Sequence, residues 1–281
     1  MPDWADPRDL DPEVRRALRG LEARNATRVA GHLVAAGSLV DEDPAEALAH
    51  ARAARDRASR IAAVREAVGV AAYHAGDYAE AARELRAYRR MSGDPGYRAV
   101  LADCERAMGR PEVALRLVRE ALEGSPDAAE TVELRLVEAG ARQDLGEVAA
   151  ARLVLEGALG GRPSPEALDW DDPGTARLAS AYADLLAAAG DEAAARPWQE
   201  AVAEHAPDDD VEVTEIEETA DEGGATAADG APAPEDGAAL EAPPGAAPGL
   251  DPAAGRDTGG RAGSPADVRR GGRGRGGRAA R

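Results

Sequence analysis

The feature that most constrains the fold of this chain is a motif that recurs along residues 42–196. Each copy joins two stretches of mixed apolar and charged residues by a short turn, which usually holds glycine, and places alanine five residues after that glycine. The copies read GDYAEAA at 76–82, GRPEVAL at 109–115, GEVAAAR at 146–152 and GDEAAAR at 190–196, with a degenerate copy, EDPAEAL, at 42–48. A unit of this size cannot bury its apolar face alone, so the pattern predicts helical hairpins that stack on one another.

The alanines of the motif give its period. They are Ala47, Ala81, Ala114, Ala151 and Ala195, so the spacings are 34, 33, 37 and 44 residues. Twelve residues before each alanine lies another small residue: Ala35, Gly69, Ala102, Ala139 and Ala183. Small side chains at both places let the two helices of a hairpin approach closely. Twelve residues after three of the alanines lie Pro126, Pro163 and Pro207, which are expected to end the second helices. Since Phe is absent and aromatic residues make up 3% of the chain, we expect an all-α fold with a core of Ala, Leu and Val.

A period near 34 residues with a glycine turn and these small residues resembles the tetratricopeptide repeat. The resemblance implies a right-handed alpha-alpha superhelix over residues 1–205, with about five hairpins. The sequence departs from the repeat in two ways. An insertion around Gly160–Gly174, which contains Trp170, separates the last two copies. The bulky aromatic residue usual in the second helix is replaced by Ala51, Leu85, Val118, Leu155 and Gln199.

An additional helix is predicted ahead of the repeats, over Pro12–Arg24. Asp11 is placed to cap its free N–H groups, and Pro12 occupies the first helical position, where a missing N–H costs nothing. We expect this helix to cap the stack.

Residues 1–205 as a whole are also similar to a family of uncharacterised actinobacterial tetratricopeptide proteins. The segments that carry the similarity are WADPRDLDPEVRRALRGL, AAYHAGDYAEAARELR and DCERAMGRPE. This resemblance implies a fold and a taxon, and it implies no activity.

The composition changes near residue 206, where a second region is predicted to begin. Residues 208–222 hold nine Asp or Glu and no basic residue, 223–267 are rich in Ala, Gly and Pro, and 269–281 read RRGGRGRGGRAAR. Such a segment cannot bury enough apolar surface to offset the entropy lost on ordering. The sequence therefore predicts a disordered C-terminal tail over residues 206–281.

The charge balance limits the partners of the repeat region. The formal net charge is −19; residues 206–281 hold 16 acids and 8 Arg, which leaves −11 for residues 1–205. An acidic surface repels phosphate and anionic lipid, so neither nucleic acid nor a membrane is expected to bind this region. The opening MPDWAD has no basic or apolar run, and no long apolar stretch follows. We therefore expect no signal peptide and no membrane span, and a cytoplasmic protein.

No arrangement of residues in the sequence predicts catalysis. Cys104, the only cysteine, lies between Asp103 and Glu105, whose carboxylates disfavour a thiolate. His32, His50, His74 and His205 lie in four separate segments and lack metal-ligand spacing. We expect neither an enzyme nor a cofactor nor a metal site.

The predicted function is a non-enzymatic protein–protein interaction module or scaffold. The repeat resemblance implies that the first helices line a concave groove, where polar side chains one turn apart would hold a protein or peptide partner. Ordinary solvated helix surface is the alternative interpretation of the same residues. The candidates are His32, Glu66, Tyr73, His74, Asp103, Arg106, Gln143, Asp144 and Asp184.

The alternative function is RNA binding through the Arg/Gly-rich C-terminus, which resembles an RGG box. Its six arginines would contact phosphates and stack on bases. Since all 34 basic residues of the chain are Arg, this terminus also fits the codon bias of a GC-rich genome, or it pairs with the acidic segment of the same chain. The residues are Arg269, Arg270, Arg273, Arg275, Arg278 and Arg281.

Overall fold

A computed structural model describes residues 2 and 4–205 of the chain, and this part is all-helical. It contains eleven α-helices, three short 3₁₀ helices and no strand. The predictions for Pro207, for the acidic segment and for the Arg/Gly terminus lie outside the described residues. Within the described part, no helix is both long and apolar enough to cross a membrane.

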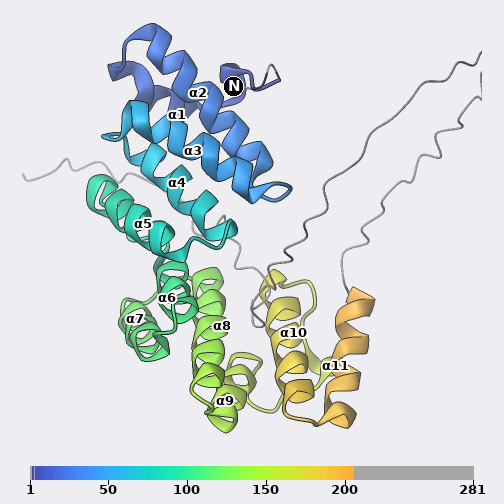
Figure 1. The fold of residues 1–281 in the computed structure, drawn as a ribbon. Helices are drawn as coiled ribbons and strands as arrows, with labels where there is room; N and C mark the ends of the chain where they lie inside the picture. The colour runs from blue at the N-terminus through green and yellow to red at the C-terminus, as the bar shows by residue number, and fades with distance from the viewer. Residues whose placement is uncertain (1, 3, 206–281) are drawn as a thin grey trace, which may run out of the picture.

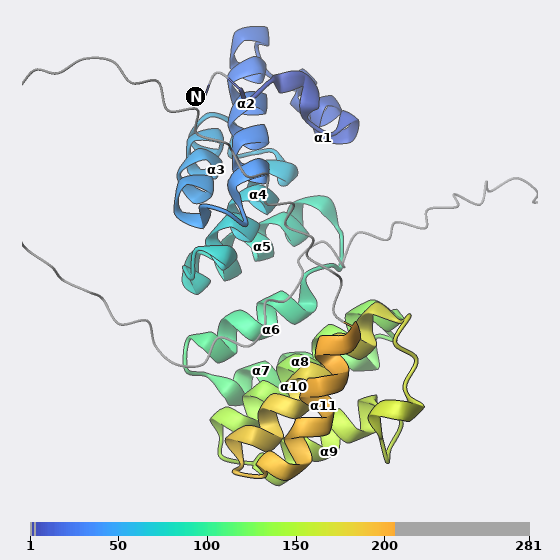
Figure 2. The same cartoon turned by 90° about the vertical axis from the view of Figure 1, so that its right-hand side faces the viewer.

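The helices pair into five hairpins that follow one another along the chain (Figure 1). The hairpins are α2 (Ala23–Leu39) with α3 (Pro44–Ala58), α4 (Ala62–His74) with α5 (Tyr78–Ser92), α6 (Arg98–Ala107) with α7 (Pro111–Glu123), α8 (Ala128–Asp144) with α9 (Val148–Ala158), and α10 (Pro173–Ala188) with α11 (Glu192–His205). The 3₁₀ helices are η1 (Pro7–Asp9), η2 (Leu18–Gly20) and η3 (Pro165–Ala167). The second helix of each hairpin packs against the first helix of the next, so the hairpins form a stack (Figure 2).

The same hydrogen-bonded turn closes four of the five hairpins. Gly76, Gly109, Gly146 and Gly190 all have a positive φ, between 74° and 82°. At Gly76, the glycine N–H donates to the carbonyl of Tyr73 (3.1 Å) and the next N–H, from Asp77, donates to the carbonyl of Ala72 (2.8 Å). This turn satisfies the last free carbonyls of the first helix, and its left-handed residue favours glycine. The glycine turns predicted from the sequence are therefore confirmed.

The alanines that give the period lie where the helices of each hairpin cross. All five of them, from Ala47 to Ala195, are 0% exposed. The small residues twelve positions earlier are buried too, and at Gly69 an added Cβ would lie 2.6 Å from Cγ and Cδ2 of Leu85. The predicted requirement for a small side chain is thus confirmed at Gly69, and the other small residues of the motif are buried.

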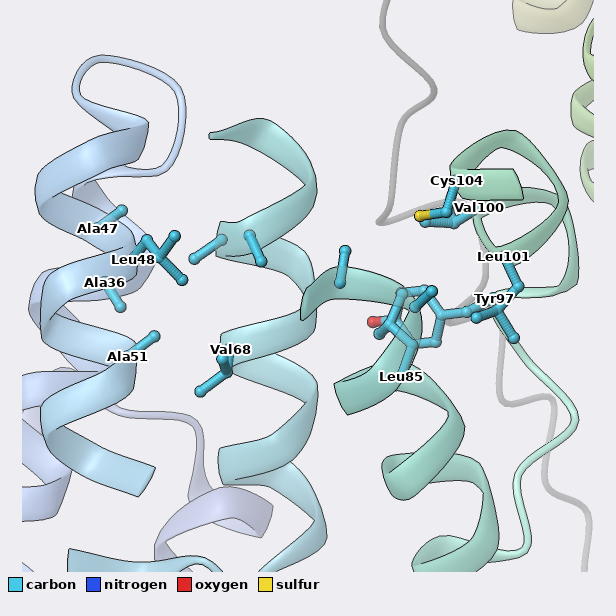
Figure 3. Close-up of a cluster of buried hydrophobic side chains, with 14 residues drawn as sticks. Ala36, Ala47, Leu48, Ala51, Val68, Leu85, Tyr97, Val100, Leu101 and Cys104 are labelled. Carbon is cyan, nitrogen blue, oxygen red and sulfur yellow. The ribbon is translucent and has the colours of Figure 1, made fainter. Parts of the chain in front are cut away.

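Apolar side chains connect the hairpins into a continuous core. One cluster extends from Leu48 of α3 through Val68 and Leu85 to Leu101 of α6, and Figure 3 shows these side chains side by side across α3–α6. Further clusters join α2 to α4, α6 to α8, and α8 to α11. Each hairpin thus covers the apolar face of its neighbour.

An arginine–carboxylate pair bridges each junction between consecutive hairpins. The pairs are Arg55 with Glu80, Arg86 with Glu105, Arg98 with Glu130, and Arg177 with Glu133. Glu80, Glu105 and Glu133 are buried. A buried carboxylate costs free energy unless it is paired, so these pairs favour one alignment of each hairpin on the next.

The prediction of one helix over Pro12–Arg24 is wrong. Asp11 does cap α1 (Pro12–Ala17), accepting from the N–H of Glu13 at 2.7 Å. The chain then passes through η2 and leaves the helical conformation at Leu21. The carboxylate of Glu22 accepts from the N–H groups of Arg24 (3.0 Å) and Asn25 (3.1 Å). A new helix, α2, therefore starts at Ala23 because Glu22 caps it.

The interpretation of the last copy is wrong by one residue. Gln199 is exposed, and the neighbouring Trp198 is buried, with its ring edge-on to Tyr182 at 5.0 Å between centroids. The last second helix therefore does hold a bulky aromatic residue. The insertion before it lies against the end of α11, where Trp170 stacks on His205 at 4.5 Å.

Candidate functional site

Four of the residues predicted to line a groove are hydrogen-bonded to one another across three hairpins. The Tyr73 hydroxyl on α4 donates to Asp103 Oδ2 on α6 at 2.7 Å, and Arg106 Nε donates to Asp103 Oδ1 at 2.7 Å. Arg106 also donates to Asp144 Oδ2 on α8 at 3.3 Å. We call Tyr73, Asp103, Arg106 and Asp144 the first-helix network.

A fifth predicted residue, His74, extends this row toward the first hairpin. Its Nδ1 lies 3.5 Å from Asp41 Oδ1 in the turn between α2 and α3, and its ring meets Tyr73 edge-on, with centroids 6.0 Å apart. Its Nε2 is buried without a hydrogen-bond partner. The row thus passes along the C-terminal ends of α4, α6 and α8.

The side chains of the first-helix network use most of their hydrogen-bonding groups on one another. Burial opposes the charge on Arg106, but Asp103 and Asp144 outweigh that effect and hold the pKa of Arg106 above its ordinary value. Burial and the charge of Asp103 raise the pKa of Tyr73, so its hydroxyl keeps the proton that it donates. Since both Asp103 oxygens already accept bonds, the network ties α4, α6 and α8 together. Contact of these residues with a partner stays a prediction.

The other predicted groove residues lie apart from the network. His32 on α2 faces His50 on α3, with their Nδ1 atoms 3.0 Å apart, and burial together with His50 lowers the pKa of His32. Glu66 accepts a hydrogen bond from the Tyr97 hydroxyl at 2.7 Å. Gln143 and Asp184 are exposed. The structure therefore joins five of the nine predicted residues and leaves four in other surroundings.

The single thiol is placed where reaction with solvent is blocked. Cys104 is 0% exposed, and burial, with a smaller effect of Asp103, raises the pKa of its thiol to about 12. A thiolate is the reactive form, so this thiol is inert in the folded chain. Among the described residues, no three His, Cys, Asp or Glu side chains stand close enough together to hold a metal ion.

The described surface has a depression along α8 that the sequence did not predict. It has a volume of about 660 Å³ and extends from Thr131 to Arg142 on α8 and along the facing side of α9. Its apolar lining comes from Val132, Ala150, Leu153, Val154, Ala158 and Leu178. We call this depression the α8 furrow; Figure 1 shows α8 between α7 and α10, with α9 beside it.

Two features distinguish the α8 furrow from the rest of the acidic surface. Its only charged lining residues are Arg135 and Arg142. Both donate to Glu138, and Arg142 also donates to Glu147, but a guanidinium has five N–H donors and both side chains remain partly exposed. The other feature is Leu153, which is 68% exposed, the most of any large apolar residue in the described part.

A weak signal for this furrow is present in the sequence. The other second helices expose mostly charged residues, with Met91 on α5 as an exception, whereas α9 reads VAAARLVLEGA and exposes both Val148 and Leu153. Apolar residues that fall outside the buried stripe of an amphipathic helix mark a contact surface. The groove predicted from the repeat resemblance involves the first helices, and α9 is a second helix.

The fold and its ion-paired junctions define an all-α protein built from repeated hairpins. No family model matches the chain, and neither a curated protein nor a solved structure matches it.

Proposed function

We propose that residues 1–205 form a tetratricopeptide-like, right-handed alpha-alpha superhelix that acts as a non-enzymatic protein-interaction module. The α8 furrow is its binding site, and the ligand is a peptide segment of a protein that combines apolar and acidic side chains. The observation that carries this proposal is the exposed Leu153 beside Arg135 and Arg142 in one depression.

The chemistry of the furrow specifies the ligand. Its apolar lining gains from contact with apolar side chains, by about 25 cal/mol for each Å² removed from water. The two guanidinium groups add charge-assisted hydrogen bonds to carboxylates, which are about twice as strong as neutral ones. A basic segment would bring further positive charge to Arg135 and Arg142 and could not accept from their remaining N–H donors, so the furrow favours an acidic ligand.

The first-helix network supports this function from within. It holds α6 and α8 in register with α4, and α8 forms one wall of the furrow. A site on rigid elements loses less entropy when a ligand binds. The exposed Gln143 and Asp184 remain candidates for contact with a partner on the first-helix side.

Selection from a displayed library of random peptides with the full chain tests the proposal. We expect the selected peptides to combine acidic and apolar residues. Their affinity, measured by fluorescence anisotropy, should fall about tenfold or more for Leu153→Asp, because contact with a buried leucine contributes roughly 1.5–3 kcal/mol. The matched control is Met91→Asp, an exposed apolar residue on α5. Peptides that bind Leu153→Asp as tightly as the parent would place the site elsewhere.

A second candidate function, RNA binding, is favoured by one observation in the sequence. Residues 269–281 hold six Arg and no acid, from Arg269 to Arg281. Arginine contacts phosphate bidentately and stacks on bases. This function requires no contribution from the hairpins, and its test is given below.

A further inference from the structure

We propose that the α8 furrow is occupied, in the absence of a partner, by residues 208–222 of the same chain. A partner then binds by displacing this segment, which makes it a built-in competitor. The inference rests on the proposed function of the furrow, since it assigns an occupant to that site.

Residues 208–222 are chemically complementary to the lining of the α8 furrow. Residues 208–222 hold nine acids and no base, and they also hold three branched apolar residues, Val211, Val213 and Ile216. The furrow offers apolar lining and the partly exposed guanidinium groups of Arg135 and Arg142, which are paired with Glu138 and Glu147 but keep further N–H donors. Residues 1–205 together carry a net charge of −11, so most of their surface repels this segment. The furrow is thus a surface where both its carboxylates and its apolar side chains gain contacts.

The segment and the furrow match in length. Thr131 and Arg142 are eleven residues apart on α8, which is about 16 Å of helix at roughly 1.5 Å per residue. Val211 and Ile216 are five residues apart, which spans about 16 Å in an extended chain at roughly 3.3 Å per residue. An extended segment is therefore long enough to run along the whole furrow, with Val211 and Val213 on the same side of the chain.

The segment begins close enough to the furrow to reach it. The segment begins three residues after His205, at which α11 ends, and six residues of chain span at most about 20 Å. Between α11 and the furrow lies one helix, α10, which packs on α8, α9 and α11. The end of α11 and the furrow are therefore separated by two distances between neighbouring helix axes, of roughly 8–10 Å each. Val211 can therefore reach the furrow.

The connection that leaves the furrow at the end of α9 also contacts the end of α11. Gly157 and Ala158 close the furrow at the C-terminus of α9. The connection that follows α9 carries Trp170, which stacks on His205. The segment that follows the C-terminal end of α9 thus contacts the C-terminal end of α11. A tethered segment binds at a high effective concentration, in the millimolar range for short linkers, so modest affinity is sufficient for occupancy.

Disulfide cross-linking in the full chain tests the proposal. The variant carries Leu153→Cys and Val213→Cys, and Cys104 does not compete because it is buried. Oxidised glutathione is the oxidant, and an intrachain link is identified by mass spectrometry after proteolysis. Two control pairs share one cysteine each with the test pair: Met91→Cys with Val213→Cys, and Leu153→Cys with Ala239→Cys. We expect the test pair to link at least about tenfold faster than either control, given the effective concentration.

A second set of variants changes only the tail, so it cannot unfold the hairpins. Replacing Glu212, Glu215, Glu217 and Glu218 with Gln should slow the link several-fold and remove its dependence on salt. The matched control replaces four acids farther along, Asp229, Glu235, Asp236 and Glu241, with their amides and should leave the rate unchanged. An ionic contact weakens as salt shortens the screening length.

Three results would overturn the proposal. Equal rates for test and control pairs would mean that the segment does not occupy the furrow. Links between two chains instead of within one would make a second copy the occupant. Equal slowing by both sets of amide variants would mean that the charges of residues 208–222 have no specific part. If library peptides still lose affinity with Leu153→Asp while the link is not favoured, the furrow binds partners and only this inference fails.

Discussion

At the scale of single residues, the tightest constraint is the crossing of α4 and α5 at Gly69. An ideal Cβ there would lie 2.6 Å from Leu85, which is fully buried and cannot move aside, while a Cβ at Gly37 on α2 would meet nothing within 4 Å. We predict that Gly69→Ala destabilises the chain, since overpacking costs roughly 1–3 kcal/mol. Gly37→Ala should stabilise it by up to about 1 kcal/mol, the helix preference of Ala over Gly. Urea unfolding followed by circular dichroism measures both, and a stabilised Gly69→Ala would contradict the close crossing.

The residues that sequence predicted well are those with a local physical demand. The turn glycines need a positive φ, and Ala81 or Ala114 needs a small side chain at a helix crossing, so each leaves a mark at a fixed spacing. Trp198 was missed because Gln199 was placed four residues after Ala195, as in the other copies, whereas in α11, which contains Pro197, the buried residue lies three after it. The pairing of Tyr73 with Asp103 was not predicted as a bond, since it depends on how closely α4 approaches α6.

At the scale of helices and their junctions, the Arg–Glu pairs make the stability of the fold depend on pH. Burial raises the pKa of Glu80, but hydrogen bonds from Arg52 and Arg55 outweigh burial and lower its pKa below the ordinary value of 4.5. Because the folded-state pKa is lowered, this contribution is present above about pH 4.5 and is lost as the pH falls through the folded-state value. We predict that Glu80→Gln costs about 1.5–3 kcal/mol at pH 7, as hydrogen bonds between charged groups do.

The matched control is Glu120→Gln, because Glu120 faces Arg116 at 4.0 Å on the exposed side of α7. An exposed pair contributes about 0.2–1 kcal/mol at most. The measurement is unfolding by urea at pH 7 and at pH 4. The difference in the free energy of unfolding between the parent and Glu80→Gln should be smaller at pH 4 than at pH 7. An equal difference at both pH values would show that the charge of Glu80 does not stabilise its contact with α3.

The helices themselves could be predicted from the sequence, but the α8 furrow could not. Periodicity within one helix predicts which face is buried. The furrow arises from the distance between α8 and α9 and from the packing of α10 behind them, which are properties of neighbouring helices. Only the apolar residues on the outer side of α9, Val148 and Leu153, indicated it in advance.

At the scale of the whole molecule, apolar clusters join all five hairpins within the described residues. The four apolar clusters and the residues packed against them lie between Leu10 and Val202. We predict that a chain ended after His205 keeps nearly all of its helical circular dichroism, with a melting temperature within about 5 °C of the full chain, since a tail outside the core adds little. A large loss of helix would mean that the folded domain extends past residue 205.

The charge of the whole chain determines how it would bind RNA. The hairpins and residues 208–222 are both acidic, so any affinity must come from the six arginines of residues 269–281. The acids of the same chain compete with phosphate for those guanidinium groups at a high effective concentration. We predict weak binding by the full chain that falls steeply with salt, and stronger binding by a peptide of residues 256–281, because counterion release makes phosphate contacts salt-dependent. Filter binding or anisotropy with a single-stranded RNA at several salt concentrations measures both. Tight, salt-resistant binding by residues 1–205 would contradict this prediction, because only a surface of the hairpins that recognises RNA through non-ionic contacts would produce it.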